Sequence, residues 1–61
     1  MRQSIKVLLR NGRAWTADEI ATSLKQPRDR VQAELHRMDD DGDVLMHAGW
    51  YRIAERARHA D

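Results

Sequence analysis

The segment TADEIATSLKQPRDRVQAELHRMDDDG, residues 16–42, contains the signals for two helices joined by a very short connection. Thr16 and, three residues later, Glu19 form a capping box, which predicts a helix over about residues 17–25. Pro27 suits the first turn of a helix and the closing glycine suits a helix end, so a longer helix is expected between them. Because only about two or three residues separate the two helices, they should meet at a steep angle as a helix-turn-helix.

Further elements are expected before this segment. Apolar residues at i, i+3 and i+4 from Ile5 share one helical face, and they predict a first helix over about residues 2–11. The dipeptide Ala14-Trp15 is too short for an independent strand. It could nevertheless add about one or two ladder bonds to the edge of a sheet.

The stretch VLMHAGWYRI, residues 44–53, predicts a β-hairpin around a two-residue turn at Ala48-Gly49. This register pairs His47 with Trp50, and cross-strand partners share a face of the sheet. The face expected in the core carries Val44, Met46, Tyr51 and Ile53. The outer face carries Leu45, His47, Trp50 and Arg52. The two adjacent aromatic residues are therefore expected to point in opposite directions.

Length and composition limit the class of protein. The 61 residues suit one small domain, expected over residues 1–54, with a short polar tail at residues 55–61. The absence of cysteine excludes a disulfide framework and a thiolate metal site. No apolar run approaches the roughly 20 residues of a membrane span, and the N-terminal segment is too short and polar for a signal peptide. We therefore expect a cytoplasmic protein with no membrane partner.

The order of these elements resembles that of the winged helix-turn-helix domain. The resemblance covers roughly residues 2–54 and rests on TADEIATSLKQPRDRVQAELHRMDDDGDV followed by GWYRIA. Val31, Met38 and Gly42 match the spacing that is usual in the third helix and at its end. The resemblance implies a minimal α+β fold, with three helices and a C-terminal two- or three-stranded antiparallel sheet. It also implies a DNA-binding transcriptional regulator or accessory factor, with the third helix in the major groove and the hairpin wing on the backbone.

Part of the chain, QPRDRVQAELHRM followed by GWYRIA, is also similar to the subgroup of winged helices that binds left-handed Z-form nucleic acid. Pro27 matches the proline that opens the third helix in that subgroup. Gln32 and His36 stand where the subgroup has an asparagine and a tyrosine, and Tyr51 stands where it has a tryptophan. These departures remove the residues that make the subgroup specific, so Z-form binding is not expected.

The outward face of the third helix is the expected DNA-reading surface. Gln32 can form two hydrogen bonds with adenine, and Arg28 or Arg30 can bind guanine or a phosphate. Ala33 would allow the helix backbone to come close to the DNA. In the hairpin, the outer side chains would lie along a phosphate backbone or reach the minor groove. The candidate DNA-binding residues are Arg28, Arg30, Gln32, Ala33, His36, Arg37, His47, Trp50 and Arg52.

Other interpretations of the same residues remain open. The third helix could be a solvated face with local ion pairs, such as Arg30 with Glu34. The acidic run at residues 39–43 opposes the helix dipole and could steer a basic protein partner. Leu45 and Trp50 could dock a partner or a second copy of the chain, or Trp50 could only cover the sheet edge. The net charge is only +1, which is low for a DNA-binding protein. The alternative function is therefore a protein-interaction module or homodimerising adaptor without DNA binding.

Catalytic and metal-binding patterns are missing from the sequence. The histidines His36, His47 and His59 lack the spacing of metal ligands. The acidic run lacks the later glutamate of a calcium loop. No serine has a local base beside it, and no glycine-rich loop is present to hold a nucleotide. We therefore expect no enzymatic activity, no cofactor and no bound metal.

Overall fold

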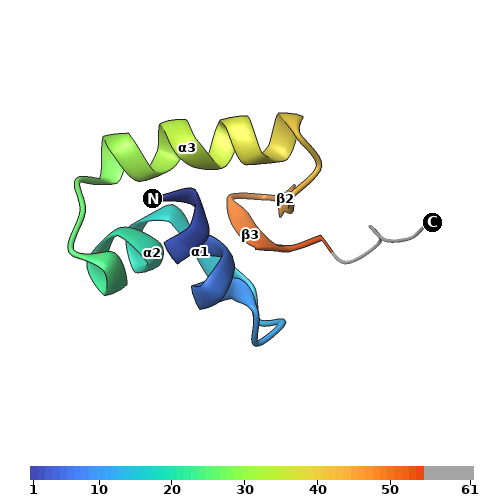
Figure 1. The fold of residues 1–61 in the computed structure, drawn as a ribbon, viewed down its shortest axis with the longest axis horizontal. Helices are drawn as coiled ribbons and strands as arrows, with labels where there is room; N and C mark the ends of the chain where they lie inside the picture. Colours follow the sequence, from blue (N-terminus) through green and yellow to red (C-terminus); the bar gives the residue numbers. More distant parts are fainter. Residues whose placement is uncertain (55–61) are drawn as a thin grey trace.

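Three helices and a three-stranded antiparallel sheet make up the structure, a computed structural model that describes residues 1–54 (Figure 1). The elements in chain order are α1 (Arg2–Leu9), β1 (Trp15–Thr16), α2 (Ala17–Leu24), α3 (Arg28–Asp40), β2 (Val44–His47) and β3 (Trp50–Ile53). This is the α+β arrangement of a winged helix-turn-helix, which confirms the predicted fold class. The tail expected at residues 55–61 lies outside the described residues.

Local signals build the connection between α2 and α3. The Thr16 hydroxyl accepts a hydrogen bond from the Glu19 N–H at 3.1 Å, and the Glu19 carboxylate accepts one from the Thr16 N–H at 3.2 Å. The predicted capping box is therefore confirmed. After α2, Lys25 takes a left-handed backbone conformation with φ of 57°. Pro27 stands as the N-cap of α3, just before the first turn in which it was expected.

α1 stops at Leu9, earlier than the predicted end near residue 11. The Arg10 N–H donates to the Val7 carbonyl at 3.2 Å, which tightens the last turn and ends the regular helix. Gly12 follows with a φ of 84°, a conformation that favours glycine and turns the chain toward β1.

The β2–β3 hairpin has the predicted register. His47 pairs with Trp50 across a turn made of Ala48 and Gly49. Both turn residues have positive φ, 52° and 85°, as in the type I′ turn whose twist matches that of the strands. Trp15 and Thr16 of β1 pair with the other edge of β3, so the expected pairing at the sheet edge is present but lies one residue later than the predicted Ala14-Trp15. The strand order is β1-β3-β2.

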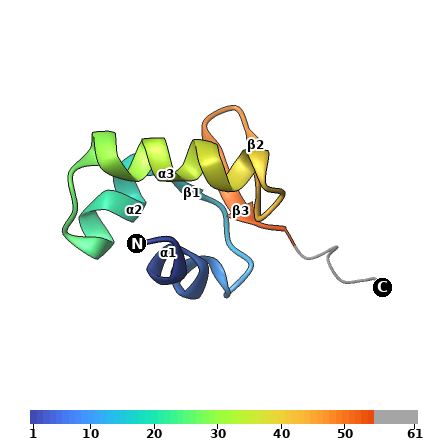
Figure 2. The same ribbon diagram turned by 45° about the horizontal axis from the view of Figure 1, so that its top comes forward.

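The core lies where the three helices meet the inner face of the sheet. Tyr51 is 4% exposed, whereas the adjacent Trp50 is 45% exposed, so their predicted opposite orientations are confirmed. Met46 lies on the inner face by register but is 48% exposed, and its prediction as a core residue is wrong. The reason is that the hairpin extends beyond α3 near its turn (Figure 2). The buried residues are Ile5, Leu9, Ala17, Ile20, Ala21, Val31, Leu35, Met38, Val44 and Tyr51.

Candidate nucleic-acid interface

The outer face of α3 is open to solvent. Val31, Leu35 and Met38 are fully buried on the opposite side, which fixes the orientation of the helix as its spacing predicts. Among the α3 residues predicted to face DNA, Gln32 is half-buried. The exposed ones are Arg28, Arg30, Ala33, His36 and Arg37. The exposed candidates are therefore spread around the solvent-facing side of α3, with Arg28 on one flank and Arg30 and Arg37 on the other.

The three arginines of α3 differ in their electrostatic partners. Arg28 Nε lies 2.6 Å from Asp18 Oδ1 of α2, but both side chains are more than half exposed, so this pair stabilises the fold by only about 0–1 kcal/mol. Arg37 Nη1 lies 3.5 Å from Glu34 Oε1. The predicted pair of Arg30 with Glu34 does not form. Within residues 1–54, Arg30 has no ion-pair partner and is the α3 cation most available to an anion.

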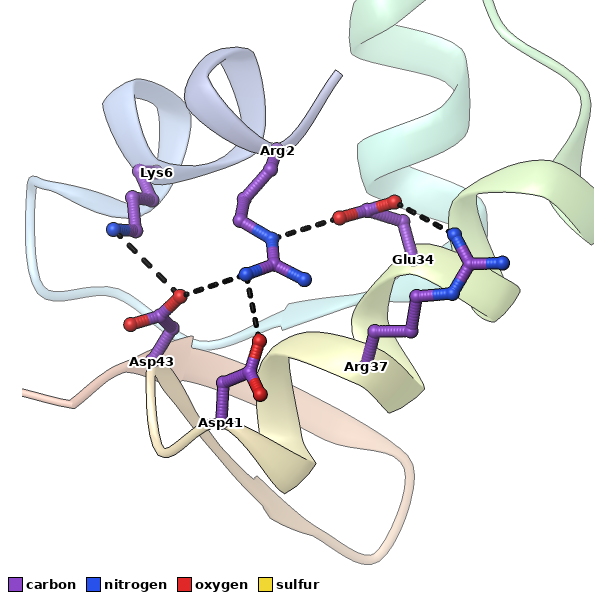
Figure 3. A network of polar contacts seen from close by, with 6 residues as sticks. All are labelled: Arg2, Lys6, Glu34, Arg37, Asp41 and Asp43. Carbon is purple, nitrogen blue, oxygen red and sulfur yellow. Dashed lines mark hydrogen bonds and ion pairs between the residues drawn. The ribbon is translucent and has the colours of Figure 1, made fainter.

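A network of charges ties the C-terminal half of α3 to α1 (Figure 3). Arg2 Nε donates to Glu34 Oε2 at 2.8 Å, and Arg2 Nη1 donates to Asp41 Oδ2 at 2.7 Å. Asp43 Oδ2 lies 3.6 Å from both Arg2 Nη1 and Lys6 Nζ. The hydrogen bond from Arg2 is the main reason that the pKa of Glu34 lies below its usual value of 4.5. The hydrogen bonds to Glu34 and Asp41 raise the pKa of Arg2.

This network gives the acidic run a structural role that the sequence analysis missed. Asp41 and Asp43 hold α1 against the end of α3, while Asp39 and Asp40 are exposed and have no ion-pair partner within the described part of the chain. The sequence contained one indication of this role. A run of acids at a helix C-terminus interacts unfavourably with the helix dipole, so cations from another element are expected to compensate it. α3 therefore carries Arg28 and Arg30 beside Asp29 in its first turn, and Asp39 and Asp40 beside Arg37 in its last.

The candidate residues of the hairpin lie on a separate surface. A groove of about 470 Å³ is lined by Ala14, Leu45, His47, Trp50 and Arg52, which we call the outer sheet face. A second hollow of about 300 Å³ adjoins it, shares Leu45 and Arg52, and is otherwise lined by Gly12 and Ile53. No residue of α3 lines either hollow. The structure thus divides the predicted DNA-binding residues into an α3 group and an outer-sheet group.

The aromatic residues of the sheet have different environments. Trp50 is nearly half exposed on the outer sheet face, as predicted, and Tyr51 is buried and out of reach of a ligand on the wing. Trp15 is partly buried, and the Arg13 guanidinium stacks 3.8 Å above its ring. The Trp15 Nε1–H is buried without a hydrogen-bond partner in the described structure. Trp50 is therefore the aromatic side chain most accessible to a partner.

Comparisons of the chain with family models, curated proteins and solved structures found no match. Among residues 1–54, no group of three or more His, Cys, Asp or Glu side chains is arranged to hold a metal ion. No helix in the same range has the length and apolar character needed to span a bilayer. The functional interpretation therefore rests on the α3 surface and the outer sheet face themselves.

Proposed function

We propose that this chain is a small DNA-binding protein that places α3 in the major groove of duplex DNA, as a transcriptional regulator or accessory DNA-binding factor. The observation that carries the proposal is the exposed outer face of α3, with arginines toward its N-terminal end. The major groove is about 12 Å wide and admits one α-helix. In helix-turn-helix proteins, the N-terminal residues of this helix contact the base edges.

The roles of the α3 residues follow from their exposure and partners. Arg30 is free to bond a guanine edge or a phosphate, because it has no ion-pair partner within residues 1–54. Arg28 can exchange its exposed contact with Asp18 for a phosphate at little cost. Ala33 is exposed and small, so it permits close approach of the helix backbone. His36 would then lie farther along the same groove.

The start of α3 offers further donors. Pro27 makes no side-chain capping hydrogen bond, so backbone N–H groups of the first turn are left without a side-chain acceptor. Phosphate oxygens are favourable acceptors at such a helix end. Asp29 in the first turn works against this attraction, and it would be best accommodated opposite a cytosine amino group.

The wing would make the second contact with DNA. His47 and Trp50 flank the turn at Ala48-Gly49, and the hairpin extends beyond α3 at this point (Figure 2). The tip is therefore the part of the sheet best placed to touch a neighbouring phosphate backbone. We also propose the cytoplasmic location that is expected from the sequence.

The test is a salt titration of binding to a random-sequence labelled duplex by fluorescence anisotropy. Affinity should fall linearly with salt concentration on logarithmic axes between about 50 and 200 mM, because each phosphate contact releases a counterion. Arg30→Ala should reduce the magnitude of the slope by about one.

The matched control is Arg10→Ala, which removes the same charge from an exposed residue beyond α1. It should leave the slope unchanged apart from a small general effect. Binding without salt dependence would contradict the proposal, and equal losses in the two variants would mean that α3 is not the contact surface.

A further inference from the structure

The outer sheet face combines apolar and basic side chains without an acid. Leu45 and Trp50 are each 45% exposed, although exposed apolar side chains of this size usually gain by being covered. They are diagonal neighbours on the sheet, since Leu45 pairs with Arg52 and Trp50 pairs with His47. Diagonal neighbours are close enough for long side chains to form one continuous surface.

The groove has the size and lining of a side-chain pocket. Its volume of about 470 Å³ lies in the range of roughly 300–1,000 Å³ that is typical of ligand sites. No carboxylate of residues 1–54 lines this groove or the adjoining hollow, and Arg52 borders both. Arg52 has no ion-pair partner within residues 1–54, so its charge is available to an anion. His47, in the neighbouring cross-strand pair, supplies a second polar group.

We propose that the outer sheet face binds an acidic peptide segment of a partner protein, with an apolar side chain seated between Leu45 and Trp50 and a carboxylate on Arg52. Charge complementarity selects this occupant, because the described residues that line the groove include a cation and no acid. The proposed site shares no residue with the exposed face of α3 and does not rest on DNA binding, although His47 and Trp50 belong both to this site and to the wing contact proposed above.

A second copy of the chain is a poorer occupant of this groove. A two-fold contact would place Arg52 against the same patch of the other copy, and like charges facing each other are costly. A stable interface between folded proteins uses about 20–30 residues on each side. The two hollows together are lined by seven residues, which suits a short segment.

Nucleic acid is also less well matched to the groove than a peptide. Binding of a single strand relies on several aromatic platforms and a track of cations. The groove offers one exposed aromatic ring and one arginine, and the remaining lining includes the aliphatic side chains of Ala14 and Leu45. A peptide with an apolar side chain next to a carboxylate can contact both the apolar lining residues and Arg52.

The test begins with a random peptide library displayed on phage and selected on the immobilised 61-residue chain. Selected peptides should be enriched in Asp or Glu next to Leu, Ile, Phe or Trp. For the best labelled peptide, Trp50→Ala should weaken binding about thirtyfold, as expected of a central aromatic contact. Replacing the acids of the peptide by lysine should abolish binding to the native chain, and Arg52→Glu should restore binding of that lysine peptide.

Two variants provide matched controls. Met46→Ala removes an apolar side chain of similar exposure from the opposite face of the same hairpin, and Arg10→Glu makes the same charge change as Arg52→Glu outside the groove. Both should bind the acidic peptide within about twofold of the native chain, the change expected away from a hot spot. Arg30→Ala should also leave peptide binding unchanged, which separates this site from α3.

Several outcomes would overturn the proposal. These are a library selection without enrichment, enrichment of basic peptides, and equal peptide binding by the native chain and Trp50→Ala. Displacement of the peptide by an oligothymidine at comparable concentration would assign the groove to single-stranded nucleic acid instead. Concentration-dependent dimerisation that Leu45→Ser abolishes would assign it to a second copy.

Discussion

Two adjacent aromatic residues allow a direct test of how the hairpin sits on the helices. Tyr51 is 4% exposed and packs in the core, whereas Trp50 is 45% exposed on the outer sheet face. A buried aromatic side chain removes roughly 150 Å² from water, and at about 25 cal/mol per Å² this corresponds to about 4 kcal/mol. Tyr51→Ala should therefore lower the free energy of unfolding by roughly that amount.

The same truncation at Trp50 should have a much smaller effect. Nearly half of the Trp50 side chain is already in water, and water fills the space that Trp50→Ala opens, so no empty cavity forms. We expect a loss of at most about 1 kcal/mol in the free energy of unfolding. A chain of 61 residues has a total stability of roughly 3–9 kcal/mol, so Tyr51→Ala should remove about half of it or more, and Trp50→Ala only a small part.

The assay is urea denaturation followed by far-ultraviolet circular dichroism, because this signal does not depend on the tryptophan that is removed. Tyr51→Phe serves as the control for the ring, and it should remain within about 1 kcal/mol of the native chain. Equal destabilisation by Tyr51→Ala and Trp50→Ala would contradict the buried position of Tyr51 and the exposed position of Trp50. It would mean that the strand register is shifted by one residue and that Trp50 faces the core.

Three further predictions concern the core, the charge network and DNA binding. Leu35→Ala opens a cavity in a fully buried position and should cost about 2–5 kcal/mol, measured by the same denaturation; an unchanged midpoint would contradict the packing of α3. Because the hydrogen bond from Arg2 lowers the pKa of Glu34, its contribution to stability is present above the unfolded pKa and is lost as pH falls through the folded one. Glu34→Gln should therefore reduce the fall in melting temperature from about pH 5 to pH 3, and an identical fall would show that this pair does not contribute. Arg28→Ala combined with Arg30→Ala should flatten the salt dependence of duplex binding by about one to two units of slope, and retained slope would exclude the start of α3 as a contact.

The parts of the fold that the sequence predicts correctly are those determined by neighbouring residues. The capping box at Thr16 and Glu19 depends on groups three residues apart, and both of its hydrogen bonds are present. The hairpin register follows from alternation in two short strands and from a turn that accepts positive φ. The prediction that Met46 lies in the core was wrong, because alternation gives the direction of a side chain but not how far the helices extend beneath it.

The charge network could not be derived in the same way, because its partners are far apart in sequence. Arg2 bonds Glu34 and Asp41, which lie 32 and 39 residues away. The predicted local pair of Arg30 with Glu34 does not form, since Glu34 pairs with Arg2 and with Arg37 instead. A pattern at i and i+4 identifies possible partners on one helix, but it says nothing about a cation that another helix brings to the same carboxylate.

The positions of the charges distinguish the two proposed ligands, duplex DNA and an acidic peptide, better than the net charge does. Arg30 is available near the start of α3, and Arg52 is available on the outer sheet face, while Asp39 and Asp40 occupy the opposite end of α3. If the two surfaces serve different ligands, Arg30→Ala should weaken duplex binding alone and Leu45→Ser should weaken peptide binding alone. The combined variant should then show the sum of the single effects, because separated sites with no shared partner are additive. If one DNA molecule covers both surfaces, Leu45→Ser should also weaken duplex binding, and the duplex should compete with the peptide.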